Sequence, residues 1–351
     1  MKYIIGHELP SKNDASVKAH IDIDHFLMEL QYKSLVFETR QGSNKISREF
    51  KRLISIMRLR KKVEKNDTIV IHYPIYSSKL DIDLFYKNVV RRADRRIAII
   101  HDLAFLRDSN PPIQKDINLE ICRLNMFNVV IVHNHAMGEI LKHYGLTAHV
   151  VELGIFDYRG NDDGDATSMK NGKHKIFFAG NLNKSSFVQY VKSDETVEYN
   201  FWGSIDDPKK LDTSVVYHGV VPSEVLPTQL KNGWGLVWDG DSADAVSGLG
   251  GNYLKYIDPH KTSLYLVSGV PVIVWGKAGV ADFIEKHHLG ITVNSLSEIS
   301  TILSNMSGYE LSVISKSVQN YKKKLLNGKM TQTAVQKAEY YLDEVGARNG
   351  N

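Results

Sequence analysis

Residues 255–275 read KYIDPHKTSLYLVSGVPVIVW, a stretch in which a helix leads into a buried strand. Pro259 suits a helix start, the apolar LYLV would anchor the helix, and Gly269 would end it. The run VPVIVW that follows is rich in valine, as is typical of parallel strands buried on both faces. Lys261 stands where a helix already carries partial positive charge. Unless this lysine is there by chance, the pattern predicts an anion bound at the helix start.

Similar apolar runs recur along the chain and alternate with helical patterns such as ASVKAHIDIDHFLMELQY. This alternation predicts βαβ units and an α/β fold with doubly wound parallel sheets. The predicted strands are KYIIG (2–6), SLVFE (34–38), TIVIHY (68–73), RIAII (96–100), NVVIVHN (128–134), KIFFAG (175–180), VEYNFWG (197–203), VVYHG (215–219), WGLVWDG (234–240) and VPVIVWG (270–276).

A polar stretch, FDYRGNDDGDATSMKNGKHK, separates two α/β halves of similar size. Its many Gly and Asp residues are typical of a linker or surface loop. We expect the halves to face each other across a cleft, with ligands at the carboxyl ends of the strands. The predicted organisation is a first domain at 1–156, a linker at 157–174, a second domain at 175–308, and helices at 309–351 that could cross back to the first domain.

Composition excludes several classes of protein. The formal net charge is +4, from 44 basic and 40 acidic side chains, which does not indicate a nucleic-acid binder. The single cysteine, Cys122, allows no disulfide within the chain, and the start lacks a signal peptide, so we expect a cytoplasmic protein. No apolar run is long enough to span a membrane. The basic segment 52–65 is interpreted as a solvated helix face, with a patch for a membrane surface or an acidic partner as the alternative.

Polar residues follow several predicted strands of the second half. Gly180, Asn181 and Lys184 come after KIFFA, where a glycine lets backbone approach a ligand and amides can bind an anion; a plain turn is the alternative. In the helix after Pro259, the amides and hydroxyls of Thr262 and Ser263 could bind phosphate oxygens beside the Lys261 charge.

The stretch WDGDSADAVSGLGG follows another strand and carries Asp239, Asp241 and Ser242. Two close carboxylates could hold Mg²⁺ or Mn²⁺, could contact ligand hydroxyls, or could simply form a turn, since Asp and Gly favour turns. Residues 247–251 read SGLGG, which predicts a flexible segment able to close over a ligand. It does not match the dinucleotide fingerprint G-x-G-x-x-G, which argues against an oxidoreductase.

The block WDGDS…SGLGGNYLKYIDPHKTSLYL…VPVIVWGKAGVADFIEKHHLG closely resembles bacterial β-1,6-galactofuranosyltransferases of cell-surface polysaccharide synthesis. It resembles more distantly the third glucosyltransferase of serine-rich-repeat adhesin glycosylation. IIHDLAFLR (99–107), VIVHNHAMGEIL (130–141) and FAGNLNKSSF (178–187) fall in the order expected for these families. The resemblance implies a GT-B architecture, two Rossmann-like halves with the nucleotide sugar bound mainly to the second.

The resemblance also implies site residues, with no bound metal and no cofactor. Around the diphosphate it places residues after two strands and in the first turn of one helix, namely Gly180, Asn181, Lys184, His260, Lys261, Thr262 and Ser263. Some relatives have arginine at Lys184, which makes the role of this lysine less certain. Around the sugar or uridine it places Asp239, Asp241, Ser242, Gly250 and Gly251.

An inverting transfer needs a base to deprotonate the acceptor hydroxyl. Asp102 is the first candidate and His101 the second, because they end the strand RIAII; the alternative is that Asp102 caps the next helix. His133 and Asn134, which also end a strand, are expected to line the acceptor side or cap a helix. Candidate acceptor contacts in the first loop are Asn13, Ser16 and Lys18, with capping as the alternative.

We therefore expect a cytoplasmic enzyme, at most peripherally bound to the inner face of the membrane. It would move a hexose from a UDP-sugar to a glycan, lipid-linked or glycoprotein acceptor, and would form a homo-oligomer. Galactofuranosyl transfer is the leading hypothesis for the reaction. Transfer of glucose or N-acetylglucosamine to adhesins is the alternative within the class. A non-catalytic protein that binds sugar nucleotides is the alternative from another class, since fold does not imply function.

Overall fold

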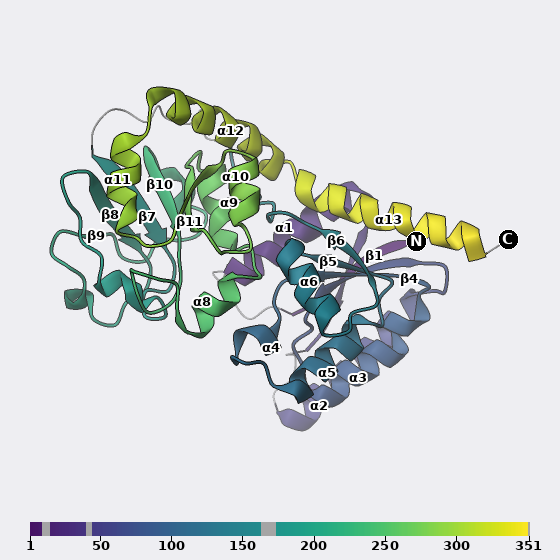
Figure 1. The fold of residues 1–351 in the computed structure, drawn as a ribbon. Helices are drawn as coiled ribbons and strands as arrows, with labels where there is room; N and C mark the ends of the chain where they lie inside the picture. The colour runs from purple at the N-terminus through teal and green to yellow at the C-terminus, as the bar shows by residue number, and fades with distance from the viewer. Residues whose placement is uncertain (9–14, 40–43, 163–172, 350–351) are drawn as a thin grey trace. The chain divides into compact units, whose positions relative to one another are not determined.

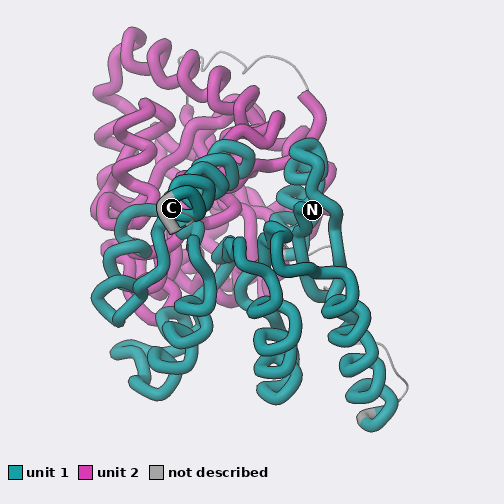
Figure 2. The backbone as a smooth tube through the Cα atoms, turned by 90° about the vertical axis from the view of Figure 1, so that its right-hand side faces the viewer, with its two compact units in different colours: residues 1–153, 330–351 teal, residues 154–329 magenta. Residues whose placement is uncertain are grey.

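The computed structural model describes residues 1–8, 15–39, 44–162 and 173–349. The chain forms two compact units, coloured separately in Figure 2. Unit 1 comprises Met1–Leu153 and Met330–Asn351, and unit 2 comprises Gly154–Lys329. Asn13 and most of the predicted linker at 157–174 lie outside the described residues. No helix among those described is long and apolar enough to cross a membrane.

Unit 1 contains a six-stranded parallel sheet in the order β2-β1-β3-β4-β5-β6. Its strands are β1 (Lys2–His7), β2 (Lys33–Phe37), β3 (Thr68–Tyr73), β4 (Arg95–Ile100), β5 (Val129–Val132) and β6 (His149–Glu152). Every residue of the central strand β3 is buried, which explains why TIVIHY lacks an alternating pattern.

The helices of unit 1 cross between these strands. They are α1 (Ala15–Glu29), α2 (Lys45–Lys62), α3 (Lys79–Asn88), η1 (Val90–Arg92), α4 (Ala104–Arg107), α5 (Gln114–Leu124) and α6 (His135–His143). Figure 1 shows α2, α3 and α5 side by side. Arg52 on α2 pairs with Asp81 on α3 at 3.0 Å, and Arg123 on α5 pairs with Asp83 on α3 at 3.2 Å.

The last helix, α13 (Lys329–Asn349), packs on unit 1 although it comes at the end of the chain. Tyr32 donates a hydrogen bond of 2.8 Å to Glu339, and Arg95 pairs with Asp343 at 2.7 Å. The ring of Tyr341 stacks on His149 of β6 at 3.8 Å. The preceding helix, α12 (Gly308–Leu326), belongs to unit 2, so the predicted segment 309–351 is divided between the units.

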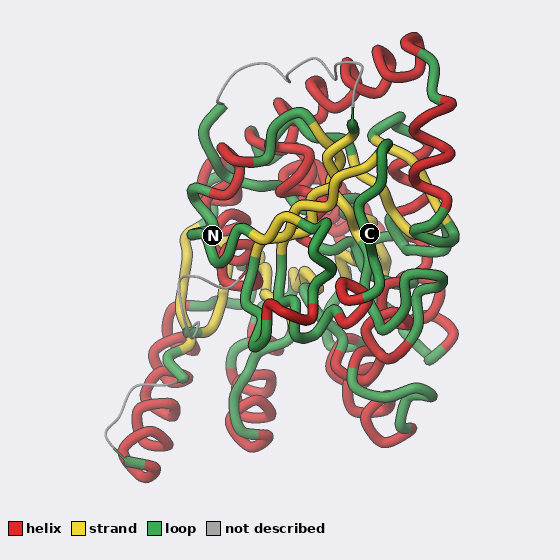
Figure 3. The backbone as a smooth tube through the Cα atoms, turned by 90° about the vertical axis from the view of Figure 1, so that its left-hand side faces the viewer, coloured by secondary structure: helices red, strands yellow, loops and turns green. Residues whose placement is uncertain are grey.

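Unit 2 contains a second six-stranded parallel sheet, in the order β12-β11-β10-β7-β8-β9. Its strands are β7 (His174–Ala179), β8 (Val197–Trp202), β9 (Val216–Tyr217), β10 (Gly233–Val237), β11 (Val272–Trp275) and β12 (Gly290–Val293). The helices before α12 are η2 (Ser186–Gln189), η3 (Pro208–Lys210), α7 (Leu226–Gln229), α8 (Gly248–Leu254), α9 (His260–Val267), α10 (Ala281–Lys286) and α11 (Glu298–Asn305). Figure 3 shows strands in yellow with helices in red packed around them.

Helix α9 lies very close to the central strand β10, and a glycine makes this possible. A Cβ atom on Gly235 would stand 2.1 Å from Cγ of Tyr265, so any side chain there would push the helix away. Tyr265 is fully buried, and its hydroxyl accepts a hydrogen bond of 2.9 Å from the amide of Ala179 at the end of β7. The start of α9 is therefore held firmly over the strands β7 and β10.

The two doubly wound α/β units confirm the predicted fold class. All ten predicted strands are present, and β6 and β12 were missed. Residues 247–251 were predicted to be a flexible segment, but residues 248–254 form the helix α8. The loop after β7 leads into the short 3₁₀ turn η2.

Candidate functional site

The strand order of unit 2 marks one end of β7 and β10 as a ligand site. The chain runs from β7 to β8 and β9 on one side, and then returns to β10 on the other side. Doubly wound sheets bind ligands at the carboxyl ends of strands, where the strand order reverses in this way. Gly180 follows β7 at this position, and Trp238 and Asp239 follow β10.

The ammonium group of Lys261 lies at this reversal point. Its Nζ is 3.5 Å from the carbonyl oxygen of Trp238 and 4.3 Å from the ring centroid of Phe178, and a Cβ on Gly180 would be 3.9 Å from it. No carboxylate of the described chain lies within ion-pair distance. Burial lowers the pKa of Lys261, and the charge of Asp239 opposes this shift only in part. Such a partly desolvated cation would be stabilised by an anionic ligand.

The other first-turn residues of α9 mostly hold the helix in place. The ring of His260 packs near those of Phe156 and Tyr158, at 5.9 and 5.2 Å between centroids. The hydroxyl of Ser263 donates a hydrogen bond of 2.6 Å to the carbonyl oxygen of Phe156. Thr262 is completely buried, and its hydroxyl has no hydrogen-bond partner among the described residues. Among the first-turn side chains, Lys261 is thus the one that an anionic ligand would stabilise.

The loop after β7 is shaped by Asn181. Its side-chain oxygen accepts hydrogen bonds from the amides of Asn183 at 3.0 Å and Lys184 at 3.3 Å. The amide of Gly180 donates to the carbonyl oxygen of Trp202 at 3.0 Å, which extends the pairing of β7 with β8. Lys184 is exposed. Gly180 therefore brings backbone close to the Lys261 ammonium, whereas Asn181 turns the chain.

The Asp-Gly-Asp turn after β10 lies against the start of α8. Asp239 accepts a hydrogen bond of 2.8 Å from the amide of Gly240, and a Cβ on Gly250 would stand 3.3 Å from its carboxylate. Gly240 has a φ of +103°, and a Cβ there would lie 2.2 Å from the carbonyl oxygen of Ser247. The glycines at 240 and 250 are therefore needed for this close packing.

Asp241 and its neighbours complete the turn. The carboxylate of Asp241 accepts a hydrogen bond of 3.1 Å from the hydroxyl of Ser186, and a Cβ on Gly248 would be 2.7 Å from it. Ser242 accepts a hydrogen bond of 3.1 Å from the amide of Asp244. A Cβ on Gly251 would be 2.6 Å from the side chain of Val246. The carboxylate of Asp241 lies beside Gly248, the first residue of α8, so its negative charge also complements the positive end of that helix.

The sheet of unit 1 has its own reversal point, between β1 and β3, because the chain goes from β1 to β2 and then returns to β3. Histidines gather near this point. His7 ends β1, His72 lies near the end of β3, and His101 directly follows β4. His20 on α1 joins them, with its ring 5.8 Å from that of His7.

A chain of hydrogen bonds joins two of these histidines to Asp24 of α1. The carboxylate of Asp24 lies 2.9 Å from Nε2 of His72, and Nδ1 of His72 lies 2.7 Å from Nε2 of His101. Ser34 donates a hydrogen bond of 2.9 Å to the second oxygen of Asp24. Because a carboxylate accepts hydrogen bonds, we assign the Nε2 proton of His72 to the bond with Asp24. His101 then donates from Nε2 to His72, which leaves the basic lone pair of His101 on Nδ1.

The histidines could also be considered as metal ligands, because one nitrogen of each of His20, His72 and His101 lies within 4.8 Å of the others. However, the rings of His20 and His101 are stacked, with centroids 3.7 Å apart and planes inclined by only 10°. A metal ion lies close to the plane of each imidazole that binds it. Two stacked parallel rings cannot both meet this condition, so the geometry favours the hydrogen-bonded chain.

Asp102, the first candidate for the base, is already engaged. One carboxylate oxygen accepts a hydrogen bond of 3.0 Å from the amide of Leu103, and the other pairs with the guanidinium group of Arg107. A carboxylate paired with arginine is a weaker base. The geometry therefore favours His101, the second candidate, over Asp102.

The remaining acceptor-side candidates have structural partners. Nε2 of His133 is 3.0 Å from the carbonyl oxygen of Ile100, and burial lowers the pKa of this histidine to about 4. Asn134 caps α6 by accepting a hydrogen bond of 3.0 Å from the amide of Met137. Lys18 pairs with Asp22 at 2.9 Å. The side chain of Ser16, like all of Asn13, lies outside the described residues.

Sequence analysis did not identify Asp24, His72 or His20 as candidates. A signal was available, because His20 and Asp24 are four residues apart and therefore share a face of the helix α1. A histidine in the apolar strand TIVIHY was a second signal, since a fully buried polar side chain needs a partner.

Comparison with known proteins gives matches along nearly the whole chain. Residues 1–155 match the family model "Glucosyltransferase 3-like, N-terminal domain", and residues 176–338 match its C-terminal counterpart. The chain is 29% identical over 283 residues to β-1,6-galactofuranosyltransferase WbbI of Escherichia coli (strain K12), which covers 80% of this chain and 78% of the relative. It is 26% identical over 270 residues to Glucosyltransferase 3 of Streptococcus parasanguinis, with 76% of each chain covered.

Solved structures with low identity share the fold. A sucrose-phosphate synthase from Thermosynechococcus elongatus superposes with a TM-score of 0.63 at 11% identity, covering 99% of this chain and 100% of the other. WaaG, a glycosyltransferase of lipopolysaccharide biosynthesis, gives a TM-score of 0.55 at 9% identity, with 97% and 99% covered. These similarities, together with the two doubly wound sheets, establish the GT-B fold.

Proposed function

Because the chain belongs to the glucosyltransferase 3-like family, matching both of its domain models, we propose that it is a UDP-sugar-dependent hexosyltransferase of bacterial cell-surface glycoconjugate synthesis. The family membership makes it a glycosyltransferase. Galactofuranosyl transfer to a glycan acceptor is the leading reaction, because WbbI is 29% identical over 80% of the chain. Transfer of glucose or N-acetylglucosamine to a glycoprotein is the second candidate, supported by the 26% identity with a streptococcal Glucosyltransferase 3.

The observation that carries this proposal is the partly buried ammonium of Lys261 at the reversal point between β7 and β10. When the glycosidic bond to a nucleotide breaks, negative charge builds on the departing diphosphate. A fixed cation that is already removed from water stabilises this charge without having to reorganise its surroundings. Lys261 and the first turn of α9 would supply this stabilisation, and we propose that no bound metal is needed.

Unit 1 would supply the base for an inverting transfer. The acceptor hydroxyl oxygen forms a bond to the anomeric carbon, and the bond from that carbon to the phosphate oxygen breaks with its electron pair leaving on the diphosphate. The hydroxyl proton passes to Nδ1 of His101. His72 and Asp24 then stabilise the resulting imidazolium through their hydrogen bonds of 2.7 and 2.9 Å.

The test is a screen for UDP release. UDP-galactofuranose, UDP-glucose, UDP-galactose and UDP-N-acetylglucosamine are compared, each with and without EDTA. We expect release from one donor, unaffected by EDTA, and lost in Lys261→Met. Lys316→Met, which changes an exposed lysine of α12, is the matched control and should keep full activity.

Each other outcome contradicts a defined part of the proposal. Release that EDTA abolishes would show that a metal takes part and that Lys261 does not act alone. Full activity of Lys261→Met would remove the lysine from the site. No release from any donor and no binding of UDP would instead favour a non-catalytic protein on the same fold.

A further inference from the structure

Helix α2 of unit 1 carries an exposed row of large apolar side chains, which we call the α2 stripe. It consists of Ile46, Phe50, Leu53 and Met57, with exposed fractions of 82, 64, 44 and 53%. Their spacing of four, three and four residues puts them on one face of the helix. Single exposed apolar residues are common in proteins, but a continuous row over three turns marks an interaction surface.

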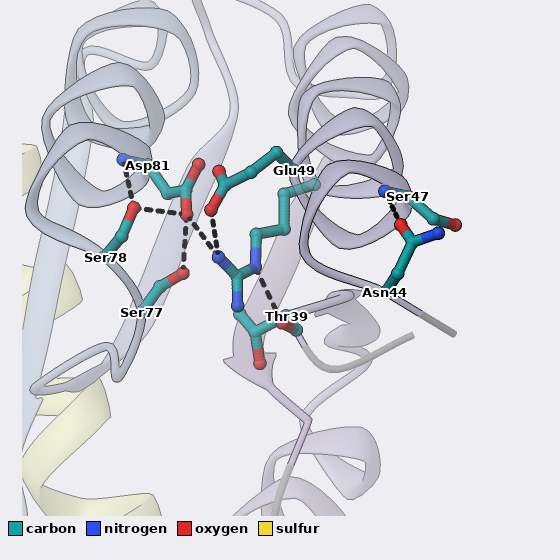
Figure 4. Close-up of polar contacts among 8 residues, drawn as sticks. Thr39, Asn44, Ser47, Glu49, Ser77, Ser78 and Asp81 are labelled. Carbon is teal, nitrogen blue, oxygen red and sulfur yellow. Dashed lines mark hydrogen bonds and ion pairs between the residues drawn. The ribbon is translucent and has the colours of Figure 1, made fainter. Parts of the chain in front are cut away.

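The opposite face of α2 is already fixed to unit 1. Ile56 and Leu59 are 3 and 4% exposed. Arg52 donates a hydrogen bond of 2.7 Å to the carbonyl oxygen of Thr39 and pairs with Asp81 of α3 at 3.0 Å (Figure 4). The helix therefore cannot rotate to bury the stripe without losing these contacts. The stripe is free for a partner outside the fold.

The charge on α2 points to an anionic partner. Its sequence, KISREFKRLISIMRLRKK, has eight basic residues and one acidic residue, which gives 8 − 1 = +7. The whole chain has a formal charge of +4, so the rest of the chain sums to 4 − 7 = −3. The excess positive charge of the protein is thus concentrated on one helix. Lys51, Arg58 and Lys61 are exposed on the side of α2 next to the stripe.

We propose that α2 binds flat on an anionic membrane surface, with the α2 stripe inserted among the lipids and the neighbouring lysines and arginines on the headgroups. A helix with an apolar row beside a basic band is the form that lies in a membrane interface. A second copy of this chain fits less well, because pairing the stripes would bring two strongly cationic helices together. This proposal goes beyond the proposed function and does not depend on it.

The experiment is co-sedimentation of the full chain with vesicles. One set is pure phosphatidylcholine, and the other contains about one third phosphatidylglycerol, a fraction that gives a strongly negative surface. We expect binding only to the anionic vesicles, weakened at high salt. The double variant Phe50→Ser/Met57→Ser and the charge variant Lys51→Glu/Lys61→Glu should each bind at least about tenfold more weakly.

Leu80→Ser is the matched control, because Leu80 on α3 is 66% exposed but lies outside the stripe, and it should bind as the unchanged chain does. UDP release in solution should be the same in all variants, so a failure here is distinct from a failure of the proposed function. Equal binding to both vesicle types, or binding that neither variant weakens, would overturn the proposal. A lack of vesicle binding would overturn it too. That holds whether light scattering shows that the stripe joins two copies of the chain or whether the stripe binds an acidic protein.

Discussion

The hydrogen-bonded chain from Asp24 through His72 to His101 predicts a specific effect of Asp24→Asn on catalysis. The asparagine side chain can donate as well as accept, so it no longer fixes the proton of His72 on Nε2. His101 would then spend part of its time with its proton on Nδ1, the atom that has to accept the proton of the acceptor hydroxyl. The maximal rate should fall about ten- to hundredfold, less than the roughly 10²- to 10⁴-fold that a general base contributes, because His101 itself is kept.

The same substitution should also move the pH dependence. The carboxylate and His101 are joined through one imidazole by contacts of 2.9 and 2.7 Å, so the negative charge of Asp24 favours the protonated form of His101.

The direction of the pH shift follows from the charge of Asp24. Removing a negative group makes the protonated imidazole less stable, so His101 loses its proton at lower pH. The acid limb of the kcat profile should therefore shift to lower pH, while the plateau falls. Asp102 follows His101 in the chain and pairs with Arg107, and His20 stacks on the ring of His101, but these groups are unchanged in the variant.

The assay is UDP release in the presence of acceptor, measured from pH 5 to pH 9 for single and double variants. In a His101→Ala background, Asp24→Asn should cause no further loss, because the carboxylate acts through the histidine. An unchanged plateau and an unchanged acid limb in Asp24→Asn would refute this reasoning. Additive losses in the double variant would show that Asp24 acts by another route.

Two further predictions concern stability. Gly235→Ala should destabilise unit 2 by about 3 kcal/mol, since the new Cβ meets the ring of Tyr265 at 2.1 Å, whereas Gly308→Ala, with open space around it, should not; urea unfolding of both variants tests this. Burial lowers the pKa of His133 from 6.5 to about 4, so the folded state resists protonation and loses stability as the pH falls below 6.5, by about 2 kcal/mol at pH 5. His133→Gln keeps a hydrogen-bond donor for the carbonyl oxygen of Ile100 but does not titrate. The variant should therefore lose much less stability between pH 7 and pH 5 in urea unfolding. An equal loss of stability in the variant would show that other groups cause the pH dependence.

Burial explains why the central strands stand out in the sequence, although it does not separate the edge strands that were predicted, β2 and β9, from those that were missed. All residues of β3 and β10 are buried, so their apolar runs stand out from the neighbouring helices. The missed strands β6 and β12 lie at the edges of their sheets, where β6 has one buried residue, Val151, and β12 has one, Val293. An edge strand pairs with a neighbour on one side only. Its pairing depends on the rest of the sheet, and a local pattern cannot show that.

The candidate site was predictable only where one short segment carries the signal. Lys261 stands out because the segment that contains it is otherwise apolar and begins a helix. The partners of His101 come from α1 and β3. His72 lies 29 residues before His101, and Asp24 lies 48 residues before His72. A sequence shows that these side chains can bond to one another, but only the strand order brings them together. For the same reason Asp102, beside His101 in sequence, was preferred although Arg107 occupies it.

Strand order therefore explains more of the chemistry than any one motif does. In each sheet the strand order reverses between two strands that are followed by polar side chains. These strands are β1 and β3 in unit 1, and β7 and β10 in unit 2. At such a point the loops after two neighbouring strands diverge, which leaves room for side chains from a helix. In unit 2 that side chain is a cation, Lys261, and in unit 1 the helix α1 supplies His20 and Asp24 around a histidine pair. The proposed mechanism requires opposite chemistry at the two points, because a departing diphosphate is stabilised by a cation whereas a hydroxyl proton is accepted by a base. With each role in its own sheet, Lys261 would favour the anion in unit 2, and the carboxylate of Asp24 would favour the imidazolium in unit 1.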